Sequence, residues 1–414
     1  MSSIRLGEIG KISMCKRILK SQTNEFSGIP FYKISTFGGT PTVYIDEKIY
    51  REYKEKYSYP KKGDILISAA GTIGKTVIFD GEDSYFQDSN IVWIENDESK
   101  VTNQFLYYFL QTNPFITTNG STIKRLYNDN LRDTKIPNVP SIQQQNQITD
   151  VLGTLDKKIQ INNQINQELE AMARTLYDYW FVQFDFPDRN GKPYKSSGGK
   201  MVYNPELKRE IPEGWGVVKL KDKLSVSRGI SYTTENIKDN IGTPMINLAS
   251  IDINRNYKSN GLKYFNGDYL KEKIVSGGDL LIACTDLTRN ADIVGSPIIV
   301  PFDEQNYVFS MDLAKIDSKV DYINKYYLYS TLRTEHYHNY IKNWASGTNV
   351  LHLNIDGINW YSISIPPVEL QEEYSKIILK FSKKTNKNIQ ENQELTQMRD
   401  WLLPMLMNGQ VKVE

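Results

Sequence analysis

The residue types that could support catalysis are few in this chain, and their spacing does not fit a catalytic motif. Gly71-Thr72-Ile73-Gly74-Lys75-Thr76 ends like a phosphate-binding loop, but Ala69 occupies the position where that motif requires its first glycine. Asn204-Pro205-Glu206 differs from the Asn-Pro-Pro-aromatic motif of adenine methyltransferases, and no Gly-x-Gly-x-x-Gly segment follows a predicted strand. We therefore expect neither a nucleotide site nor a catalytic residue.

Histidine and cysteine, which supply most transition-metal sites, are sparse. His336 and His338 are two residues apart, which does not place them on one face of a helix, and His352 is the third histidine. Cys15 and Cys284 form no Cys-x-x-Cys pair and no disulfide framework. The sequence therefore predicts no metal site and a reducing, cytoplasmic compartment. No apolar run reaches the roughly 18 residues of a membrane span.

Several loops combine basic, amide and hydroxyl side chains, which suit nucleic acid. Arginine and asparagine match base edges in the major groove, and lysine matches phosphate. The candidate DNA-contacting residues are Lys16, Arg17, Thr72, Lys75, Lys124 and Arg125 in the first half, and Arg289, Asn290, Thr348 and Asn349 in the second. A solvated loop is the competing interpretation of each cluster. A net charge of +1 argues against strong DNA binding by the chain alone.

The elements that must position these loops occur twice in the sequence. From Pro140 to Leu176, adding 226 to a residue number gives a matching residue without a gap; Pro140 matches Pro366, and Asn162 matches Asn388. Earlier in the chain, the Gly-Asp-Ile-Leu-Ile segment that begins at Gly63 matches Gly-Asp-Leu-Leu-Ile at an offset of 215. The change of offset indicates loop insertions between shared elements.

The duplicated unit is a mixed globular domain followed by a long helix. We predict globular domains at 1–140 and 213–366, helices within 141–186 and 367–414, and an exposed linker at 187–212, which is rich in Gly, Ser, Pro and Lys. The expected fold class is α+β, with two similar mixed domains separated by two long antiparallel, coiled-coil-like helices in a pseudo-two-fold repeat.

Short β-rich runs recur in both globular domains, and a helical run follows each set. Strands are expected at Pro30–Ser35, Asp64–Ser68, Thr76–Phe79 and Ile91–Ile94, and again at Pro244–Ala249, Asp279–Ala283, Ser296–Val300 and Asp312–Ile316. Helices are expected at Asn103–Thr112 and Tyr322–Arg333. Gly-Asp before an Ile-Leu-Ile run predicts a turn that leads into a buried strand, so a sheet should form the core of each domain.

Both long helices carry a heptad seam of the coiled-coil kind. The first seam is Ile148, Leu152, Leu155, Ile159, Asn162, Asn166, Leu169, Ala173, Leu176 and Trp180, and the second is Tyr374, Ile378, Phe381, Thr385, Asn388, Asn392, Leu395, Arg399, Leu402 and Leu406. Pro187 is expected to stop the first helix and Pro404 to interrupt the end of the second. The alternative is that each helix packs only against its own domain.

Two asparagines stand at the same place near the middle of each seam. A buried amide costs free energy unless it is paired, and a polar seam residue sets the register of a coiled coil. We therefore expect the helices to pack antiparallel about a pseudo-two-fold, so that these amides meet near the crossing. On the helix flanks, Tyr177, Tyr179, Phe181 and Trp401 either bury against partner proteins or pack within this chain.

The order and duplication of several motifs resemble a known family. These motifs are the twice-used Gly-Asp-Ile/Leu-Leu-Ile strand, Gly71-Thr72-Ile73-Gly74-Lys75, Ile136-Pro137-Asn138-Val139-Pro140, the helical block Gln144–Phe184 and its copy from Pro366. Along nearly all of its length the chain resembles the specificity (S) subunit of type I restriction–modification systems.

The resemblance implies two target-recognition domains, each reading one half of a bipartite site in double-stranded DNA, and two helical spacers. It also implies docking of two modification (M) subunits, which carry the methyl donor and adenine methylation. Restriction (R) subunits would bring ATP-driven translocation and cleavage through the complex, and this chain would hold no cofactor. A coiled-coil adaptor that binds only proteins is the alternative, and an independent enzyme is a more distant one.

Overall fold

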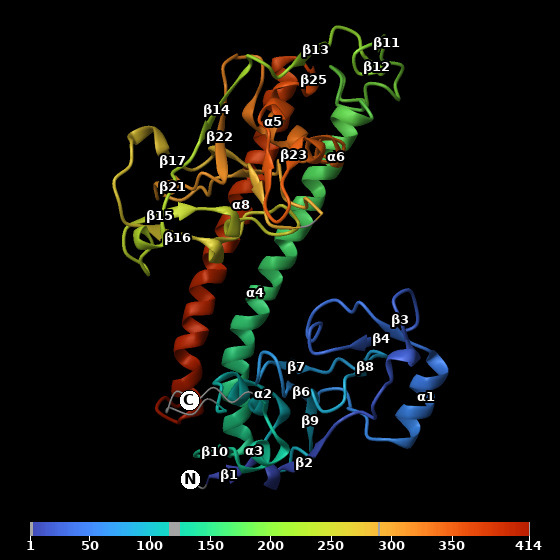
Figure 1. Cartoon of the computed structure of the whole chain (residues 1–414), viewed down its shortest axis with the longest axis vertical. Coiled ribbons are helices and arrows are strands. Elements are labelled where there is room, and N and C mark those ends of the chain that lie inside the picture. Colours follow the sequence, from blue (N-terminus) through green and yellow to red (C-terminus); the bar gives the residue numbers. More distant parts are fainter. Residues whose placement is uncertain (1–2, 116–124, 289, 414) are drawn as a thin grey trace. The chain divides into compact units, whose positions relative to one another are not determined.

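The chain forms two compact units, each built around one globular α+β domain (Figure 1). The computed structural model describes residues 3–115, 125–288 and 290–413. The first unit comprises Met1–Ile159 and Gln393–Glu414, and the second comprises Gln160–Asn392. Each unit therefore contains one domain together with a part of each of two long helices. In the part of the chain that the model describes, no helix is long and apolar enough to cross a membrane.

The domain of the first unit contains two small sheets. The first sheet is antiparallel, in the order β2 (Gly10–Ser13), β9 (Ile91–Asn96), β6 (Ile65–Ser68) and β7 (Thr76–Ile78). The second has the order β3 (Thr23–Asn24), β5 (Tyr44–Ile45), β4 (Ile29–Tyr32) and β8 (Tyr85–Phe86), and its β4–β8 pair is parallel. Helices α1 (Glu47–Lys56), α2 (Asn103–Gln111) and α3 (Asn128–Asp133) and the β1–β10 pair (Ile4–Arg5 with Lys135–Ile136) complete the domain.

The central strand β6 shows why the Gly-Asp-Ile-Leu-Ile segment recurs. Gly63 has a φ of +92°, which favours glycine, and Asp64 Oδ2 accepts the backbone N–H of Lys61 at 2.7 Å to close the turn. All four residues of the strand that follows are buried. On one side of the sheet α2 packs against it, with Phe105 and Leu106 fully buried. The segment thus combines a tight turn with the middle of the core.

The domain of the second unit repeats the first sheet strand for strand, and it repeats the β5–β4–β8 part of the second sheet. Its first sheet has the order β14 (Leu224–Arg228), β22 (Leu313–Ser318), β18 (Leu280–Ala283) and β20 (Pro297–Ile299), all antiparallel. Its second has the order β16 (Lys263–Phe265), β15 (Thr243–Ile246), β21 (Tyr307–Phe309) and β17 (Ile274–Val275), with β15–β21 parallel as β4–β8 is. Helices α5 (Lys325–Leu332), α6 (Glu335–Ile341) and α7 (Asp356–Asn359) and the β13–β25 pair (Gly216–Lys219 with Ser362–Ile365) follow. The duplication read from the sequence is confirmed.

All eight strands and both short helices expected in the domains are present, with bounds shifted by a few residues. The largest differences lie at the ends, where the expected run Pro30–Ser35 corresponds to β4 (Ile29–Tyr32) and Tyr322–Arg333 to α5 (Lys325–Leu332). The helix α5 starts late because Asn324 caps it, its side chain accepting the N–H of Tyr326.

The two long helices are α4 (Ile142–Tyr177) and α8 (Val368–Met407) (Figure 1). The sequence predicted that Pro187 would stop α4. The helix instead ends earlier, at Tyr177, and a π-helical turn at Asp178–Val182 follows it. Pro404 does not interrupt α8 either, and the helix continues through it to Met407. Its ring removes one hydrogen bond in the last turn, where the freed carbonyl belongs to the exposed Asp400.

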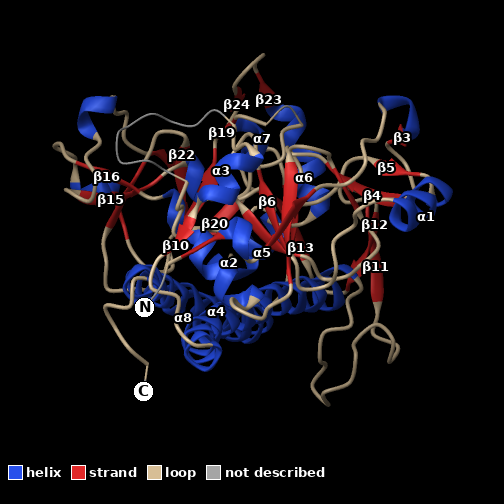
Figure 2. Ribbon diagram, turned by 90° about the horizontal axis from the view of Figure 1, so that it is seen from below, coloured by secondary structure: helices blue, strands red, loops and turns tan. Residues whose placement is uncertain are grey.

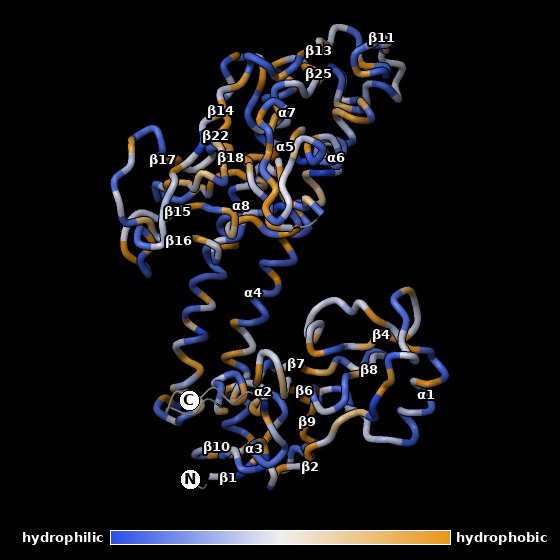
Figure 3. Tube along the Cα trace, in the orientation of Figure 1, coloured by the Kyte–Doolittle hydropathy of each residue, from blue (hydrophilic) through white to orange (hydrophobic). Residues whose placement is uncertain are grey.

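The heptad seam is the inward face of both helices. Every seam residue is buried or half-buried, whereas much of the remaining surface of α4 is hydrophilic (Figure 3). In the first unit Ile148 and Leu152 of α4 share a core cluster with Leu403 and Leu406 of α8. In the second unit the end of α4 and the start of α8 run side by side, as Figures 1 and 2 show. The helices therefore form a coiled-coil-like pair in addition to packing on their domains.

The seam asparagines pair across the two helices within the second unit. Asn162 Nδ2 donates to Asn392 Oδ1 at 2.9 Å, and Asn388 Nδ2 donates to Asn166 Oδ1 at 2.8 Å. The repeat offset of 226 converts one pair into the other, since 162 corresponds to 388 and 392 to 166. The numbers rise along one helix as they fall along the other, so the packing is antiparallel. The expectation that these amides meet is confirmed, with each contacting the partner one turn away from its own copy.

Arg399 is the seam residue that a hydrophobic pattern explains least. In the first unit its Nη1 donates to Asp156 Oδ1 at 2.9 Å, and Asp156 Oδ2 accepts the Tyr108 hydroxyl of α2 at 2.7 Å. The charge on the seam is therefore neutralised by α4 and fixed by the domain. In the second unit Glu170 of α4 pairs with Arg333, which follows α5, at 2.5 Å and so links the helix to the domain.

The segment 187–212, expected as an exposed linker, is folded onto the second unit. It contains a β-hairpin of β11 (Met201–Asn204) and β12 (Arg209–Pro212). The ring of Phe186 stacks on both Tyr194 and Trp215, with centroids 4.7 and 5.3 Å apart. These aromatic contacts fix the path of a segment whose Gly, Ser and Lys content indicates only exposure.

We predict that replacing Asn388 by alanine lowers the free energy of unfolding by about 1–3 kcal/mol, because Asn166 Oδ1 then stays half-buried without its donor. Asn162→Ala should cost at least as much, since the Asn162 amide also donates to Glu391. Urea unfolding followed by circular dichroism measures both. The matched control is Lys387→Ala, an exposed neighbour, which should change stability by less than about 0.5 kcal/mol. Equal effects of the 387 and 388 substitutions would contradict the pairing.

Candidate nucleic-acid interface

A three-stranded sheet gathers two candidate loops on one face of the second domain. Its order is β19 (Thr285–Asp286), β24 (Leu351–Leu353) and β23 (Ala345–Ser346), and Asp286 pairs with Leu351. The loop after β19 carries Asn290, and the β23–β24 hairpin carries Thr348 and Asn349. All three side chains are exposed, so the candidates of the second half lie on neighbouring strands with their polar groups free to reach a ligand.

The loop after β19 is shaped by the carboxylate of Asp286, which is fully buried. Its Oδ1 accepts the N–H of Thr288 at 2.6 Å, and its Oδ2 accepts the N–H groups of Ile293 and Val294 at 2.7 and 2.8 Å. Three charge-assisted hydrogen bonds hold both ends of the loop to one side chain. The carboxylate therefore fixes the positions of Thr288, Ile293 and Val294.

The β23–β24 hairpin depends on glycine at its tip. Gly347 has a φ of +141°, and a Cβ atom there would lie 1.9 Å from the carbonyl oxygen of Val350. Only glycine fits this turn without moving the backbone. The Gly-Thr-Asn motif therefore presents Thr348 and Asn349 at a fixed position.

Two exposed apolar residues lie near these loops, and only Met311 stands outside the loop clusters that the sequence indicated. Leu287 is 66% exposed in the Asp286 loop. Met311 is also exposed, and Arg228 links it to the face by donating to the carbonyl oxygens of Met311 and Leu353, at 3.1 and 3.4 Å. Exposed apolar side chains between polar ones suit contact with the methyl group of thymine. A search for basic and amide residues does not identify Met311.

In the first domain the corresponding loop is the turn between β6 and β7. Gly71 and Gly74 take φ values of +65° and +82°, and Ser68 Oγ joins the two sides by donating to the Thr72 carbonyl and accepting the N–H of Lys75. A strand follows this turn, whereas a phosphate-binding loop is followed by a helix. Thr72 is exposed at the tip. The second domain uses Asp286 for the task that Ser68 performs here.

Lys75 and Arg125 lie beside this turn, and both have partners in the protein. Lys75 Nζ donates to the carbonyl oxygen of Phe37 at 2.6 Å and so ties the 33–40 loop to the turn. Arg125 Nη2 donates to the carbonyl of Ser89 at 3.0 Å, and the adjacent Leu126 N–H bonds to Ala69. The structure thus brings Thr72, Lys75 and Arg125 together. Lys75 retains two further N–H groups that a phosphate can use.

The remaining candidates are not part of these two clusters. Lys16 Nζ lies 5.0 Å from the ring centroid of Tyr57, just beyond α1, and the Lys16 carbonyl accepts the Tyr85 hydroxyl at 3.1 Å. Lys16 and Arg17 are exposed, and the contacts of Lys16 are with Tyr85 of the second sheet and with Tyr57 beyond α1. Lys124 and Arg289 lie outside the described residues.

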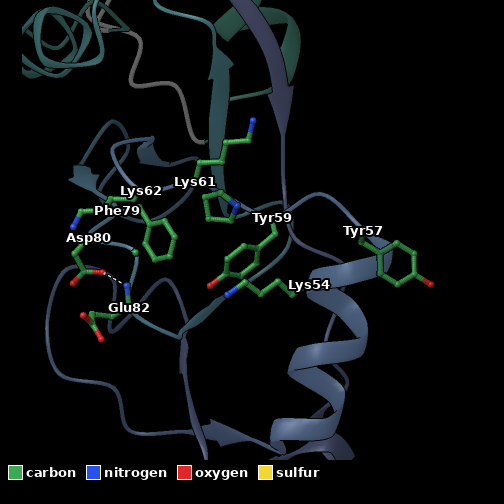
Figure 4. Close-up of a pocket in the computed structure, with 10 residues that line it drawn as sticks. Lys54, Tyr57, Tyr59, Lys61, Lys62, Phe79, Asp80 and Glu82 are labelled. Carbon is green, nitrogen blue, oxygen red and sulfur yellow. Dashed lines mark hydrogen bonds between the residues drawn. The ribbon is translucent and has the colours of Figure 1, made fainter.

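A pocket of about 600 Å³ opens near α1 in the same domain (Figure 4). Lys54 lies beside Tyr59 in Figure 4, and its ammonium donates to Tyr50 Oη at 2.7 Å and pairs with Asp83 at 3.2 Å. Burial raises the pKa of Tyr50 to about 12, and its hydrogen bond to Asp83 acts in the same direction. The aromatic wall and Lys54 are thus committed to internal contacts. The lining mixes three lysines with Asp80 and Glu82, so its charge does not select an anion.

Within the described residues, no group of three or more His, Cys, Asp or Glu side chains has the arrangement of a metal site. The two cysteines are buried, and burial raises the pKa of Cys15 to about 12 and that of Cys284 to about 11. Neither thiol is therefore ionised near neutral pH, which makes both inert packing residues.

The helix flanks divide into a buried and an exposed set. Tyr177 and Phe181, expected as possible docking residues, are buried in the core of the second unit, where the Tyr177 hydroxyl donates to Thr331 Oγ1 at 3.0 Å. The helix turns them inward toward α5. Tyr179 and Trp401 are exposed, at 37% and 61%. Met172 on α4, Val182 in the π-helical turn after it and Met398 on α8 are exposed apolar residues as well.

Comparison with known proteins gives one consistent family. The family model for the type I restriction modification DNA specificity domain matches residues 1–171 and 212–397. The MjaIX specificity subunit of Methanocaldococcus jannaschii, a type I restriction enzyme subunit, is 28% identical over 368 residues, which cover 85% of this chain and 78% of that one. The HindI specificity subunit of Haemophilus influenzae is 25% identical over 421 residues, covering 85% and 87%.

A third relative is more similar over a shorter stretch. It is a putative type I restriction enzyme specificity subunit of Haemophilus influenzae, 53% identical over 180 residues, which span 43% of this chain and 46% of that one. Among solved structures, the S subunit of the type I restriction–modification system of M. genitalium has the same fold, with a TM-score of 0.57 at 14% identity and coverage of 98% and 95%. Since the family domain matches most of the sequence, once in each half, the chain belongs to the DNA specificity subunits of type I restriction–modification systems.

Proposed function

We propose that each domain reads one half of a bipartite DNA site, and that this chain supplies specificity without catalysis. The observation that carries the proposal is the repeated scaffold with unlike loops. The strands β6 and β18 correspond, yet the loops that follow them are held by Ser68 in one domain and by Asp286 in the other. Two copies of one scaffold with different exposed side chains are suited to two different base sequences.

The contact residues that we propose are Thr72, Lys75 and Arg125 in the first domain, and Asn290, Thr348 and Asn349 with Leu287 in the second. Base edges are matched by Asn, Thr and apolar groups, and phosphates by Lys and Arg. These clusters contain few free cations, and the chain has a net charge of only +1. Partner subunits then provide much of the phosphate contact, which dominates DNA affinity.

The two long helices are proposed to set the distance between the half-sites. At about 1.5 Å per residue, the 36 residues of α4 and the 40 residues of α8 correspond to lengths of about 54 and 60 Å. One turn of DNA measures about 34 Å. The paired asparagines hold the helices in one register, so a fixed length is available to act as the spacer.

We further propose that two modification subunits dock on the exposed apolar stripes of α4 and α8. Met172 and Met398 correspond through the offset of 226, and Tyr179 and Trp401 extend the stripes on their own helices. Exposed aromatic and methionine side chains are enriched in protein interfaces. The methyl donor would bind to the modification subunits and ATP to restriction subunits, and this chain would contribute DNA recognition alone.

Exchange of the loop residues tests the assignment of half-sites. Thr348→Ala with Asn349→Ala should relax base preference in one half of the site, at a cost of about 1–3 kcal/mol, because direct base contacts are lost. Thr72→Ala should relax the other half only. Sequencing of methylated DNA after reconstitution with the modification subunits measures both. The two variants serve as controls for each other. Loss of base preference at both half-sites in either variant would contradict the proposal that each domain reads one half-site.

A change of helix length tests the spacer. One heptad inserted after Ile159 and another after Glu394, which lie at the same level of the antiparallel pair, should lengthen the DNA spacer. Seven residues add about 10 Å, or about 3 base pairs at about 3.4 Å each. Both half-site sequences should stay unchanged in the methylated DNA. Altered half-sites at an unchanged spacing would show that the helices take part in reading bases.

Substitution of Trp401 tests the docking stripe. Trp401→Ala should weaken binding of the modification subunit at least tenfold, because exposed tryptophans at interfaces commonly act as hot spots. Titration of the purified modification subunit by calorimetry measures the affinity. The matched control is Trp360→Ala, since Trp360 is 46% exposed but lies outside the stripes. If both variants bind equally well, the stripe is not the docking surface.

A further inference from the structure

The second unit contains a cavity of about 460 Å³ that none of the functions above uses. It lies between the C-terminal part of α4, helices α5 and α6, strand β25 and the β11–β12 hairpin. Rings of Tyr177, Phe181, Tyr327 and Tyr361, all of them buried, form much of its wall. A cavity of this size with an aromatic lining and a few polar groups is the usual form of a binding site.

Most of the charge around the cavity is neutralised internally. Arg333 Nη2 donates to Glu170 Oε1 at 2.5 Å, and Arg174 Nε donates to the same oxygen at 3.0 Å. Burial opposes ionisation of Glu170, but these two guanidinium groups outweigh it and lower the pKa of the carboxyl. Glu335 pairs with Arg255. These groups stabilise the wall and leave little capacity to bind a charged ligand.

Arg209 is the exception. Its Nη2 donates to the Phe181 carbonyl at 3.1 Å, and its guanidinium lies 4.7 Å from the ring centroid of Phe184. Its Nε is buried and has no hydrogen-bond partner among the described residues, and no ion pair of Arg209 is found among them either. An unpaired buried donor costs about 1–3 kcal/mol. The side chain is thus held in place. Its Nε is closed to a ligand, but among the described residues its Nη1 also has no hydrogen-bond partner and can donate to an anionic group in the cavity.

We infer that this cavity is an anchor site for the modification subunit, which inserts an apolar side chain next to a carboxylate. The carboxylate would accept from Arg209 Nη1, and the apolar side chain would pack on the tyrosine rings. Charge complementarity supports this occupant. So does position, because Val182 lines the cavity and is exposed, like Tyr179, in the π-helical turn that continues the stripe of α4. The inference rests on the docking proposed above and adds the chemistry of the contact.

The residues that line the cavity on α4 are not repeated at the matching positions of α8. Adding 226 to Glu170, Arg174 and Phe181 gives Thr396, Asp400 and Met407, so the charged wall and the ring are not repeated on α8. One of the two docking surfaces therefore has an anchor that the other lacks in this form. The two modification subunits should then bind with unequal affinity.

Two substitutions test the anchor in the full-length chain. Arg209→Gln removes the charge at similar size, and Ala173→Trp fills the cavity from α4. Each should weaken binding of one modification subunit at least tenfold and leave the other site unchanged, as measured by calorimetry and native mass spectrometry. Lys208→Gln is the matched control, because Lys208 is the exposed neighbour of Arg209 and does not line the cavity. Thermal unfolding of each variant checks that the chain is folded.

The alternative occupant is a small molecule, and it is tested with phenylacetate, a small aromatic carboxylate. Phenylacetate that competes with the modification subunit at the Arg209 site supports the anchor. Unchanged affinity for the modification subunit in both folded variants overturns it, and binding of phenylacetate without competition would instead assign the cavity to a small molecule. Methylation of a bipartite site is scored separately. If the unsubstituted complex does not methylate a bipartite site, the proposed function is refuted. If it does, and all variants bind the modification subunit equally well, only the anchor is refuted.

Discussion

A buried amide must find a partner, and in this chain that requirement fixes how the long helices pack. Asn162 and Asn388 are almost completely buried, and leucine at both positions would permit several registers of the seam. Their hydrogen bonds to Asn392 and Asn166 form only when the helices run antiparallel at one register. Oδ1 of both residues has no partner among the described residues, which is a cost that an apolar seam would avoid. The amides thus lower stability but fix one alignment of the helices. Any function of the helix length depends on that alignment.

The domains follow a second constraint, which separates the scaffold from the surface that varies. Strands β6 and β18 occupy the same place in identical sheets and are buried on both faces. Their side chains cannot change much without loss of the core. The loops that follow are held mainly by Ser68 or by Asp286, and side chains such as Thr72, Leu287 and Asn290 are exposed on them. Such loops can change residues, and therefore the bases that they match, without a large cost in stability.

The sequence predicted the scaffold well because its signals are periodic and repeated. The heptad seam identified the inward face of both helices, and two copies of each strand made the strand assignments mutually supporting. The loops were predicted only as residue types. Nothing in the order of residues shows that Asp286 bonds to N–H groups seven and eight positions away, or that Lys75 is tied to Phe37. Tyr177 and Tyr179 differ by two positions on one helix, and only the position of α5 decides which is buried.

The charge of the chain connects these features. Basic residues near the candidate loops are largely used to build them, as Lys75, Arg125 and Arg228 donate to backbone carbonyl groups. A surface assembled in this way is shaped before it meets DNA, but it contributes few free cations to the phosphate backbone. In the function proposed above, discrimination between sequences comes from the loops and affinity comes from partner subunits. That proposed division is consistent with a net charge near zero, and it would make correct docking of the partners a condition for recognition.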